Sequence, residues 1–305
     1  MHGPSEDLPV NLQSSLRKPP WLKRRALTTE VWQRMKPMLD GLSLATICEE
    51  AECPNIGECF RRRTATFLIL GRSCTRNCRF CAVEHGRPEP VDRDEPHHLV
   101  EAVRQLGLRH VVITSVTRDD LPDGGAAHFA ACLEAVHYDT LATAEVLVPD
   151  FQGERAPLQA VLGARPDVLG HNVEVVPRLY PKLRPQADYK RSLQLLERSK
   201  VLRPSTYTKS SLMVGVGEQE QEVIRVMRDL HAVDCDFLTI GQYLRPSARH
   251  YPVLQYVHPA ILDRYAQAAK ELGFRAVLCG PFVRSSYRAG ELLENARRAA
   301  FRLPM

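Results

Sequence analysis

The chain has 305 residues, of which 44% are hydrophobic and 25% are charged, a composition typical of a soluble globular protein with a full core. Its formal net charge of +5 is modest for this length and does not argue for a nucleic-acid partner. No apolar run approaches the roughly 18 residues that a membrane span needs, so we expect no membrane contact.

Strand-like and helix-like segments alternate along the chain. Most of the seven predicted strands are continuously hydrophobic, as strands buried on both faces of a parallel sheet are; they are Thr66–Leu70, His110–Ser115, Glu145–Pro149, Asp167–Gly170, Ser211–Gly215, Phe237–Gly241 and Ala276–Gly280. Between them lie stretches with helical period at Pro96–Leu106, Gly125–His137, Ala156–Gly163, Tyr189–Arg198, Glu220–Ala232 and His258–Leu272. This alternation predicts an α/β fold in one barrel-like domain.

Six of the nine cysteines form two triplets. The first has the spacing C-x4-C-x5-C and the second C-x3-C-x2-C; they are Cys48, Cys53 and Cys59, followed by Cys74, Cys78 and Cys81. Each triplet is one thiolate short of the four ligands that structural zinc and electron-transfer clusters usually have. Two incomplete triplets therefore indicate two cubane clusters, each with an iron open to another ligand. The paired spacing and the lack of a secretory segment favour reduced thiols in the cytosol.

The second triplet directly follows a predicted strand. Thr66–Leu70 is the strand, Gly71 ends it, and Cys74–Cys81 forms the loop that follows. Active sites of parallel barrels lie at the carboxyl ends of the strands, so this loop is well placed for catalysis. The first triplet precedes the same strand, and we expect its cluster to fold over the mouth of the barrel from the N-terminal side.

The second triplet resembles the motif of the radical S-adenosylmethionine (SAM) superfamily, and Phe80 before Cys81 matches the aromatic residue usual there. The resemblance implies a [4Fe-4S] cluster whose open iron binds S-adenosylmethionine and generates a 5′-deoxyadenosyl radical. It also implies a partial (β/α)6 TIM-like barrel with N-terminal and C-terminal extensions. A zinc knuckle or an electron-transfer cluster is the alternative, but zinc would need a nearby fourth ligand and a ferredoxin would not need a barrel.

A more specific resemblance is to the lipoyl synthases, because the segment Cys48–Cys59 is similar to their auxiliary-cluster motif. Further blocks agree with that family in the same order, namely Ala65–Gly71, Val112–Gly125, Glu145–Phe151, Gly170–Glu174 and Gly280–Tyr287. Each block alone is weak. Their order, together with both triplets, is what identifies the family.

The resemblance implies two [4Fe-4S] clusters, with the first triplet and a serine of the motif Arg-Ser-Ser-Tyr at 284–287 holding the auxiliary one. On the resemblance alone we favour Ser286 over Ser285, since spacing does not separate them, and we predict Ser286 and Arg284 as catalytic residues. An alkoxide binds iron less well than a thiolate, so Ser286 is the expected point of opening when the cluster gives up sulfur. Alternatively, both serines cap a helix that starts near Arg288.

Four polar residues are candidate contacts of S-adenosylmethionine or substrate. The resemblance suggests that Asn172 and Glu174, just past a predicted strand, hydrogen-bond ribose hydroxyls. Asp119 and Asp120, in the loop after another strand, are predicted to orient cofactor or substrate. The alternatives are loop capping for the first pair and turn formation for the second.

The implied reaction inserts two sulfur atoms, at C6 and C8, into an octanoyl chain on a lysine of a lipoyl carrier domain, with sulfur drawn from the auxiliary cluster. The enzyme would be a cytoplasmic radical SAM sulfurtransferase. Its implied partners are octanoylated domains of 2-oxoacid dehydrogenase E2 or glycine cleavage H protein, an electron donor such as ferredoxin or flavodoxin, and an iron–sulfur carrier for cluster repair. Residues 1–60 would carry the auxiliary cysteines, 61–283 the barrel core and 284–305 the serine motif.

Two other interpretations stay open. A biotin-synthase-like sulfur inserter or a methylthiotransferase would also use two clusters, but the first triplet's spacing and the Arg-Ser-Ser-Tyr motif are not expected there. A non-catalytic iron–sulfur electron carrier or an iron-responsive nucleic-acid binder would fit the cysteines and the slight basicity. Reductive cleavage of S-adenosylmethionine separates these binders from an enzyme.

Overall fold

One sheet forms the centre of the protein. The computed structural model describes residues 17–23, 29–51, 53–61 and 64–301. The strands are hydrogen-bonded in chain order from β1 to β8, and within the described ranges no pairing closes the sheet into a complete barrel. Only β1 is antiparallel to its neighbour; the strands are β1 (Ala45–Thr46), β2 (Thr66–Ile69), β3 (His110–Ser115), β4 (Thr143–Leu147), β5 (Val168–Gly170), β6 (Tyr207–Val214), β7 (Phe237–Gln242) and β8 (Ala276–Gly280).

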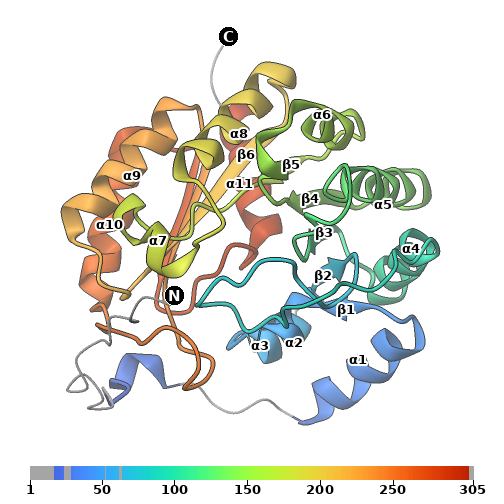
Figure 1. Cartoon of the computed structure of the whole chain (residues 1–305), viewed down its shortest axis with the longest axis horizontal. Coiled ribbons are helices and arrows are strands. Elements are labelled where there is room, and N and C mark those ends of the chain that lie inside the picture. The colour runs from blue at the N-terminus through green and yellow to red at the C-terminus, as the bar shows by residue number, and fades with distance from the viewer. Residues whose placement is uncertain (1–16, 24–28, 52, 62–63, 302–305) are drawn as a thin grey trace, which may run out of the picture.

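Six helices follow β2 to β7 in turn and form an arc around the sheet (Figure 1). They are α4 (Glu95–Leu106), α5 (Ala126–Asp139), α6 (Arg155–Gly163), α8 (Tyr189–Leu202), α9 (Glu220–Ala232) and α10 (Pro259–Leu272). The predicted open (β/α)6 barrel is confirmed, with β8 as a further parallel strand. In the part of the chain that the structure describes, no helix is long and apolar enough to cross a membrane.

The other helices are short or lie outside this alternation. They are η2 (Pro20–Leu22), α1 (Thr29–Gly41), α2 (Ile47–Glu50), α3 (Ile56–Arg61), η3 (Phe151–Gly153), η4 (Pro177–Leu179), α7 (Tyr180–Leu183) and α11 (Ala289–Phe301). Helices α2 and α3 carry two of the first triplet's cysteines and lie beside β1 and β2 (Figure 1).

The main core lies between the outer face of the sheet and the helices. Phe67 of β2 and Ile113 of β3 belong to one apolar cluster with Phe129 and Leu133 of α5, and all four are fully buried. Side chains alternate between the two faces of a strand, so the remaining strand residues face the barrel interior. That inner face is where polar groups can meet a ligand.

Strand β6 begins at Tyr207, earlier than the predicted start at Ser211. The prediction missed the first residues of the strand because one of them is charged. The Lys209 ammonium contacts a carboxylate oxygen of Glu145 on β4 at 2.7 Å, and both side chains are buried. Lys209 on β6 and Glu145 on β4 lie on either side of β5. The lysine interrupts the run of hydrophobic residues from which the start of β6 was predicted.

Helix α11 lies inside the arc rather than outside it (Figure 1). Leu292 packs with Val168 and Phe237, the first residues of β5 and β7. Arg297 pairs with Asp167, which directly precedes β5. The C-terminal helix therefore fills the amino end of the barrel.

Candidate active site

The second triplet lies in the loop after β2, at the carboxyl end of the sheet. The amide of Cys74 donates to the carbonyl of Glu84 at 2.8 Å, and the amide of Cys81 donates to the carbonyl of Cys78 at 3.0 Å. Cys74 also forms an isolated bridge with His85. The loop thus folds back on itself, and the thiols come close enough to interact electrostatically.

Two of these thiols, those of Cys78 and Cys81, favour the protonated form in the absence of a cation. Burial raises the pKa of Cys81 to about 12 and also raises the pKa of Cys78. A positive metal centre would displace such protons, because a coordinating thiol is deprotonated outright. Two backbone amides, those of Arg76 and Thr117, already point at the Cys74 sulfur at 3.4 and 3.3 Å and would stabilise negative charge there.

Asn172 and Glu174, which follow β5, reach the same loop. The Asn172 amide donates to a Glu174 carboxylate oxygen at 2.9 Å. Burial raises the pKa of Glu174 despite the nearby Arg184, and Glu174 interacts electrostatically with Cys78 and Cys81. The side-chain oxygen of Asn172 is buried and, among the described residues, has no hydrogen-bond partner. It is an acceptor available to a ligand.

Sequence reasoning missed Arg184, which directly follows α7. Its guanidinium donates to the backbone carbonyls of Asn172 and Val173, each at 3.0 Å, and it interacts with the thiol of Cys78. Its Nε is buried, and in the described part of the chain it contacts no acceptor. The residue supplies positive charge beside the triplet. No motif spacing links Arg184 to the cysteines, so only the fold could reveal it.

The two predicted aspartates differ in what they contact. Asp119 accepts two hydrogen bonds, at 2.6 and 2.9 Å, from Arg76 in the cysteine loop. Asp120 is instead held by Arg118 at 2.9 and 2.8 Å, which also donates to the carbonyl of Leu70. Asp119 therefore touches the cysteine loop, whereas Asp120 stabilises the turn after β3.

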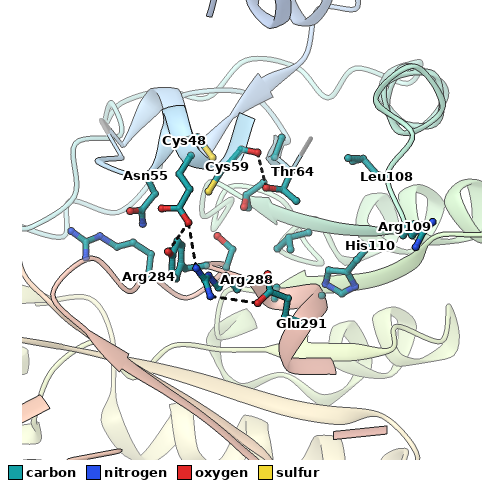
Figure 2. A pocket seen from close by; sticks show the side chains of 18 of the residues that line it. Cys48, Asn55, Cys59, Thr64, Leu108, Arg109, His110, Arg284, Arg288 and Glu291 are labelled. Atoms are coloured by element: carbon teal, nitrogen blue, oxygen red, sulfur yellow. Dashed lines mark hydrogen bonds and ion pairs between the residues drawn. The ribbon is translucent and has the colours of Figure 1, made fainter. Parts of the chain in front are cut away.

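The first triplet lines a cavity of about 480 Å³ (Figure 2). Cys48 lies in α2, Cys59 in α3 and Cys53 between them, where its amide donates to the carbonyl of Cys48 at 3.0 Å. Burial, together with the neighbouring Cys53 and Cys59, raises the pKa of Cys48 to about 12. The three thiols therefore lie close together.

The same cavity is lined by Arg284 and Ser286 from the far end of the chain, whereas Ser285 does not line it. Figure 2 shows Arg284 on the side of the cavity opposite Cys59. Three thiols and one hydroxyl thus line the same cavity, and this lining supports Ser286 over Ser285 as the candidate fourth donor.

Two hydrogen bonds join the serine motif to the first triplet's segment. The Tyr287 hydroxyl donates to a carboxylate oxygen of Glu58 at 2.8 Å, and the Asn55 amide donates to the carbonyl of Phe282 at 2.6 Å. Arg288 also pairs with Glu58, at 3.7 Å (Figure 2). Segments more than 200 residues apart in sequence are therefore held together at the cavity wall.

The cavity borders the amino ends of β2 and β3 and the segment that follows β8. Thr66 and His110, which line it, are the first residues of β2 and β3. Strand β1 runs antiparallel to β2 and pairs Thr46 with Phe67, so the chain leaving β1 towards Cys48 approaches the start of β2. The first triplet therefore lies near the start of β2, while Glu50 of α2 also pairs with Arg72, in the loop after β2, at 3.3 Å. A cluster folded over the mouth of the barrel stays a prediction.

The donors do not form a closed site for one ion. Within the described ranges, no group of three or more His, Cys, Asp or Glu side chains converges as the ligands of a single metal ion. Each thiolate of a cubane binds a different iron, so its sulfurs are spread farther apart than those around one tetrahedral zinc. The arrangement of both triplets is compatible with clusters.

Comparison with known proteins decides the family. The profile described as the Radical SAM superfamily matches residues 68–230. The chain is 56% identical over 283 residues to the lipoyl synthase of Caldanaerobacter subterraneus subsp. tengcongensis, covering 93% of this chain and 99% of the relative. It is 52% identical over 299 residues to the lipoyl synthase of Rubrobacter xylanophilus, covering 97% and 93%. This chain belongs to the lipoyl synthase family.

Membership of the lipoyl synthase family makes the chain a radical SAM sulfurtransferase that uses S-adenosylmethionine and a [4Fe-4S] cluster. Solved structures agree with the fold. Streptococcus suis SuiB bound to S-adenosylmethionine has a TM-score of 0.55 at 9% identity, over 74% of this chain and 53% of that one. TYW1 with a lysine-pyruvate adduct has a TM-score of 0.51 at 14% identity, over 80% and 82%. At such identities these likenesses show the fold alone, and the family prediction from sequence is confirmed by the closer relatives.

Proposed function

We propose that this chain inserts sulfur at C6 and C8 of an octanoyl chain carried on a lysine of a lipoyl carrier domain, and that the sulfur comes from a second [4Fe-4S] cluster. The observation that carries the proposal is the cavity in which the first triplet meets Ser286. A cluster that only transferred electrons would be expected to have four protein thiolates. A cluster held by three thiolates and one hydroxyl oxygen is suited to opening, because the oxygen is the weaker ligand for iron.

The residues around the second triplet fit the radical-generating cluster. Three thiols in one loop leave one iron for the amino and carboxylate groups of S-adenosylmethionine, and this pair supplies a radical able to remove hydrogen from an unactivated carbon. The buried, unpartnered oxygen of Asn172, one of the described side chains, suits a ribose hydroxyl, and Glu174 beside it suits a second. The Arg184 guanidinium offers its buried Nε to an anionic ligand.

The cluster at the first triplet is a substrate in this proposal, because its sulfide atoms end in the product. The thiols of the first triplet would hold three irons and the Ser286 hydroxyl the fourth. Iron binds an oxygen ligand of this kind less tightly than a thiolate, so the cluster would open at Ser286.

The reaction requires partners beyond the chain itself. We propose octanoylated E2 or H-protein domains as the carrier substrate, ferredoxin or flavodoxin as the reductant, and an iron–sulfur carrier that rebuilds the consumed cluster in the cytoplasm. We also propose the division into 1–60, 61–283 and 284–305. Residues 1–16, 24–28 and 52 of the first part, 62–63 of the second and 302–305 of the third lie outside the described residues.

The test is direct. Fully reconstituted protein is incubated with an octanoyl-lysine peptide, S-adenosylmethionine and a strong reductant, and the peptide is analysed by mass spectrometry. We expect two added sulfur atoms and an iron content of about eight per chain, four for each cubane. Deoxyadenosine formation without any sulfur-containing peptide would overturn the proposal, and so would full activity with about four irons. A reaction without reductant is the control.

A further inference from the structure

Arg76 is a buried side chain in an otherwise exposed part of the cysteine loop. It lies between Cys74 and Cys78 and is 7% exposed, whereas the neighbouring Asn77 and Arg79 are exposed. Nothing in the cysteine motif requires an arginine at this position. A charged side chain is buried only when other groups compensate it, so its partners indicate its role.

Arg76 contacts two carboxylates that come from different strand ends. Its Nε and Nη2 donate to the two oxygens of Asp119, after β3, at 2.6 and 2.9 Å. Nη2 also donates to Asp150, after β4, at 2.7 Å. The other oxygen of Asp150 accepts from Arg191 on α8 at 3.2 Å. We call Arg76, Asp119, Asp150 and Arg191 the Arg76 network.

Asp150 is the most deeply buried carboxylate of the Arg76 network, and it is ionised. Burial raises the pKa of Asp150, but Arg76 outweighs it and holds that pKa at about 2, and the Asp150 side chain is 1% exposed. Buried ion pairs often contribute little stability compared with apolar residues of similar size. Their geometry is nevertheless specific, because a guanidinium binds a carboxylate in a fixed, two-pronged arrangement. The network therefore fixes position more than it adds stability.

What the network positions is the first ligand of the second triplet. The amides of Arg76 and Thr117 both point at the Cys74 sulfur, at 3.4 and 3.3 Å. Thr117 and Asp119 belong to the segment after β3, and the Thr75 hydroxyl bonds both, donating to the Thr117 carbonyl at 2.9 Å and accepting from the Asp119 amide at 3.1 Å. The side chain of Arg76 thus holds together the two segments whose amides face the sulfur.

We propose that Arg76 is a positioning residue for the radical cluster: its network fixes the cysteine loop against the ends of β3 and β4 and keeps two N–H groups directed at the Cys74 sulfur. The inference rests on the proposed function in that the second triplet holds the cluster. Two consequences follow. Hydrogen bonds to cluster sulfurs tune the reduction potential and, by stabilising the more negative reduced state, raise it. A fixed loop also keeps the radical aligned with the substrate.

The experiment isolates the second triplet. In a background with Cys48, Cys53 and Cys59 replaced by alanine, bound iron reports on the second triplet alone. There, Arg76→Gln should accelerate iron loss to a chelator by about tenfold, since it removes the guanidinium from Asp119 and leaves Asp150 paired with Arg191 alone. It should also make the midpoint potential of the cluster more negative. Arg79→Gln is the matched control, because it makes the same change in the same loop at an exposed side chain and should behave like the parent.

The coupling of radical formation to product formation is measured in the otherwise unaltered chain. Arg76→Gln should raise the ratio of deoxyadenosine to lipoyl product, because the radical forms but is misaligned. A purely structural role would lower the amount of folded protein and leave this ratio and the potential unchanged, and that outcome would overturn the inference. Adding Asp150→Asn to Arg76→Gln should restore part of the iron retention, since it removes a buried charge that has lost one of its two guanidinium partners.

A second variant covers the case in which Arg76→Gln does not fold. Asp119 is 30% exposed, so Asp119→Asn removes one of the two carboxylate partners of Arg76 with less disturbance of the fold. It should shift the midpoint potential and the ratio of deoxyadenosine to lipoyl product in the same directions as Arg76→Gln. A parent that binds no iron at the second triplet would overturn the cluster assignment, and the inference with it. An iron-loaded parent whose Arg76 and Asp119 variants match it in potential and coupling would overturn the inference alone.

Discussion

The two cysteine triplets are built in opposite ways. The second occupies one loop after β2, and its ligands are neighbours in sequence. The first is distributed over α2, a connection and α3, and its cavity is completed by Ser286 after β8. A local loop needs only its own backbone bonds and nearby side chains, whereas the distributed site depends on the sheet, on α11 and on the bonds that Tyr287 and Asn55 make.

The difference separates two chemical tasks. The local triplet lies at the carboxyl end of the barrel, beside the half-buried ionisable groups Arg184 and Glu174. The distributed triplet lies near the start of β2, in a cavity that is also lined by Ser286 from a distant segment. A cluster that is used in every turnover benefits from a rigid loop. The proposed sulfur donor is consumed, and it benefits from a ligand on a distant segment that can let go of it.

The largest expected effect comes from breaking the local triplet. Cys78→Ala should abolish both deoxyadenosine formation and lipoyl product, because two thiolates do not retain the cluster that binds S-adenosylmethionine. Chromatography of deoxyadenosine is the measurement. Cys132→Ala removes a buried thiol on α5 and should keep normal deoxyadenosine yield. A Cys78 variant with normal yield would contradict the assignment of the second triplet.

Breaking the distributed triplet should have a narrower effect. Cys53→Ala should eliminate sulfur insertion and spare deoxyadenosine formation, because sulfur donation and radical generation are assigned to different triplets. Mass spectrometry of the peptide and deoxyadenosine analysis are run on the same sample. Lipoyl product from this variant would show that the first triplet is not the sulfur donor.

Changing the oxygen donor should sharpen the comparison further. Ser286→Ala should keep iron content and deoxyadenosine yield but lower lipoyl product by about tenfold, which corresponds to about 1.4 kcal/mol, because the thiols still hold the cluster. Ser286→Cys should also keep iron but stall at or before the first insertion, since a thiolate binds iron more tightly. Ser285→Ala is the matched control, because Ser285 does not line the cavity.

These serine variants also decide between the two positions. If the Ser286 variants behaved like wild type and Ser285→Ala failed, the ligand would be Ser285. Full activity of all three would remove the serine ligand altogether.

The smallest expected effect concerns the wall of the cavity. Tyr287→Phe deletes the hydrogen bond to Glu58, which is worth about 1 kcal/mol, while Arg288 still pairs with Glu58. We expect a fall of about 1 kcal/mol in the free energy of unfolding, measured by denaturant titration, with normal deoxyadenosine formation. Tyr138→Phe, at a 91% exposed position, is the control and should leave stability unchanged. An equal loss of stability in the Tyr287 and Tyr138 variants would mean that the hydrogen bond to Glu58 does not hold the cavity wall together.

Much of the radical site could be predicted because its information is local. The spacing of Cys74, Cys78 and Cys81 after an apolar strand places the loop at a carboxyl end, and the structure confirms that position. The parallel strands could be predicted for the same reason, since burial on both faces gives continuous apolar runs. Strand β6 was predicted too short because Lys209 pairs with Glu145 across the interior, and a lone sequence does not show that pairing.

The sequence by itself determined the family, the open barrel and the six cysteines, because each is written in contiguous residues or in the order of short blocks. Only the tertiary structure decided that the first triplet lies beside the start of β2, that Ser286 and not Ser285 lines its cavity, and that Arg184 and Arg76 belong to the second triplet. The physical reason is that these features depend on contacts between distant segments: the antiparallel pairing of β1 with β2, the placement of α11 inside the barrel, and the convergence of strand ends that brings Asp119 and Asp150 to one guanidinium.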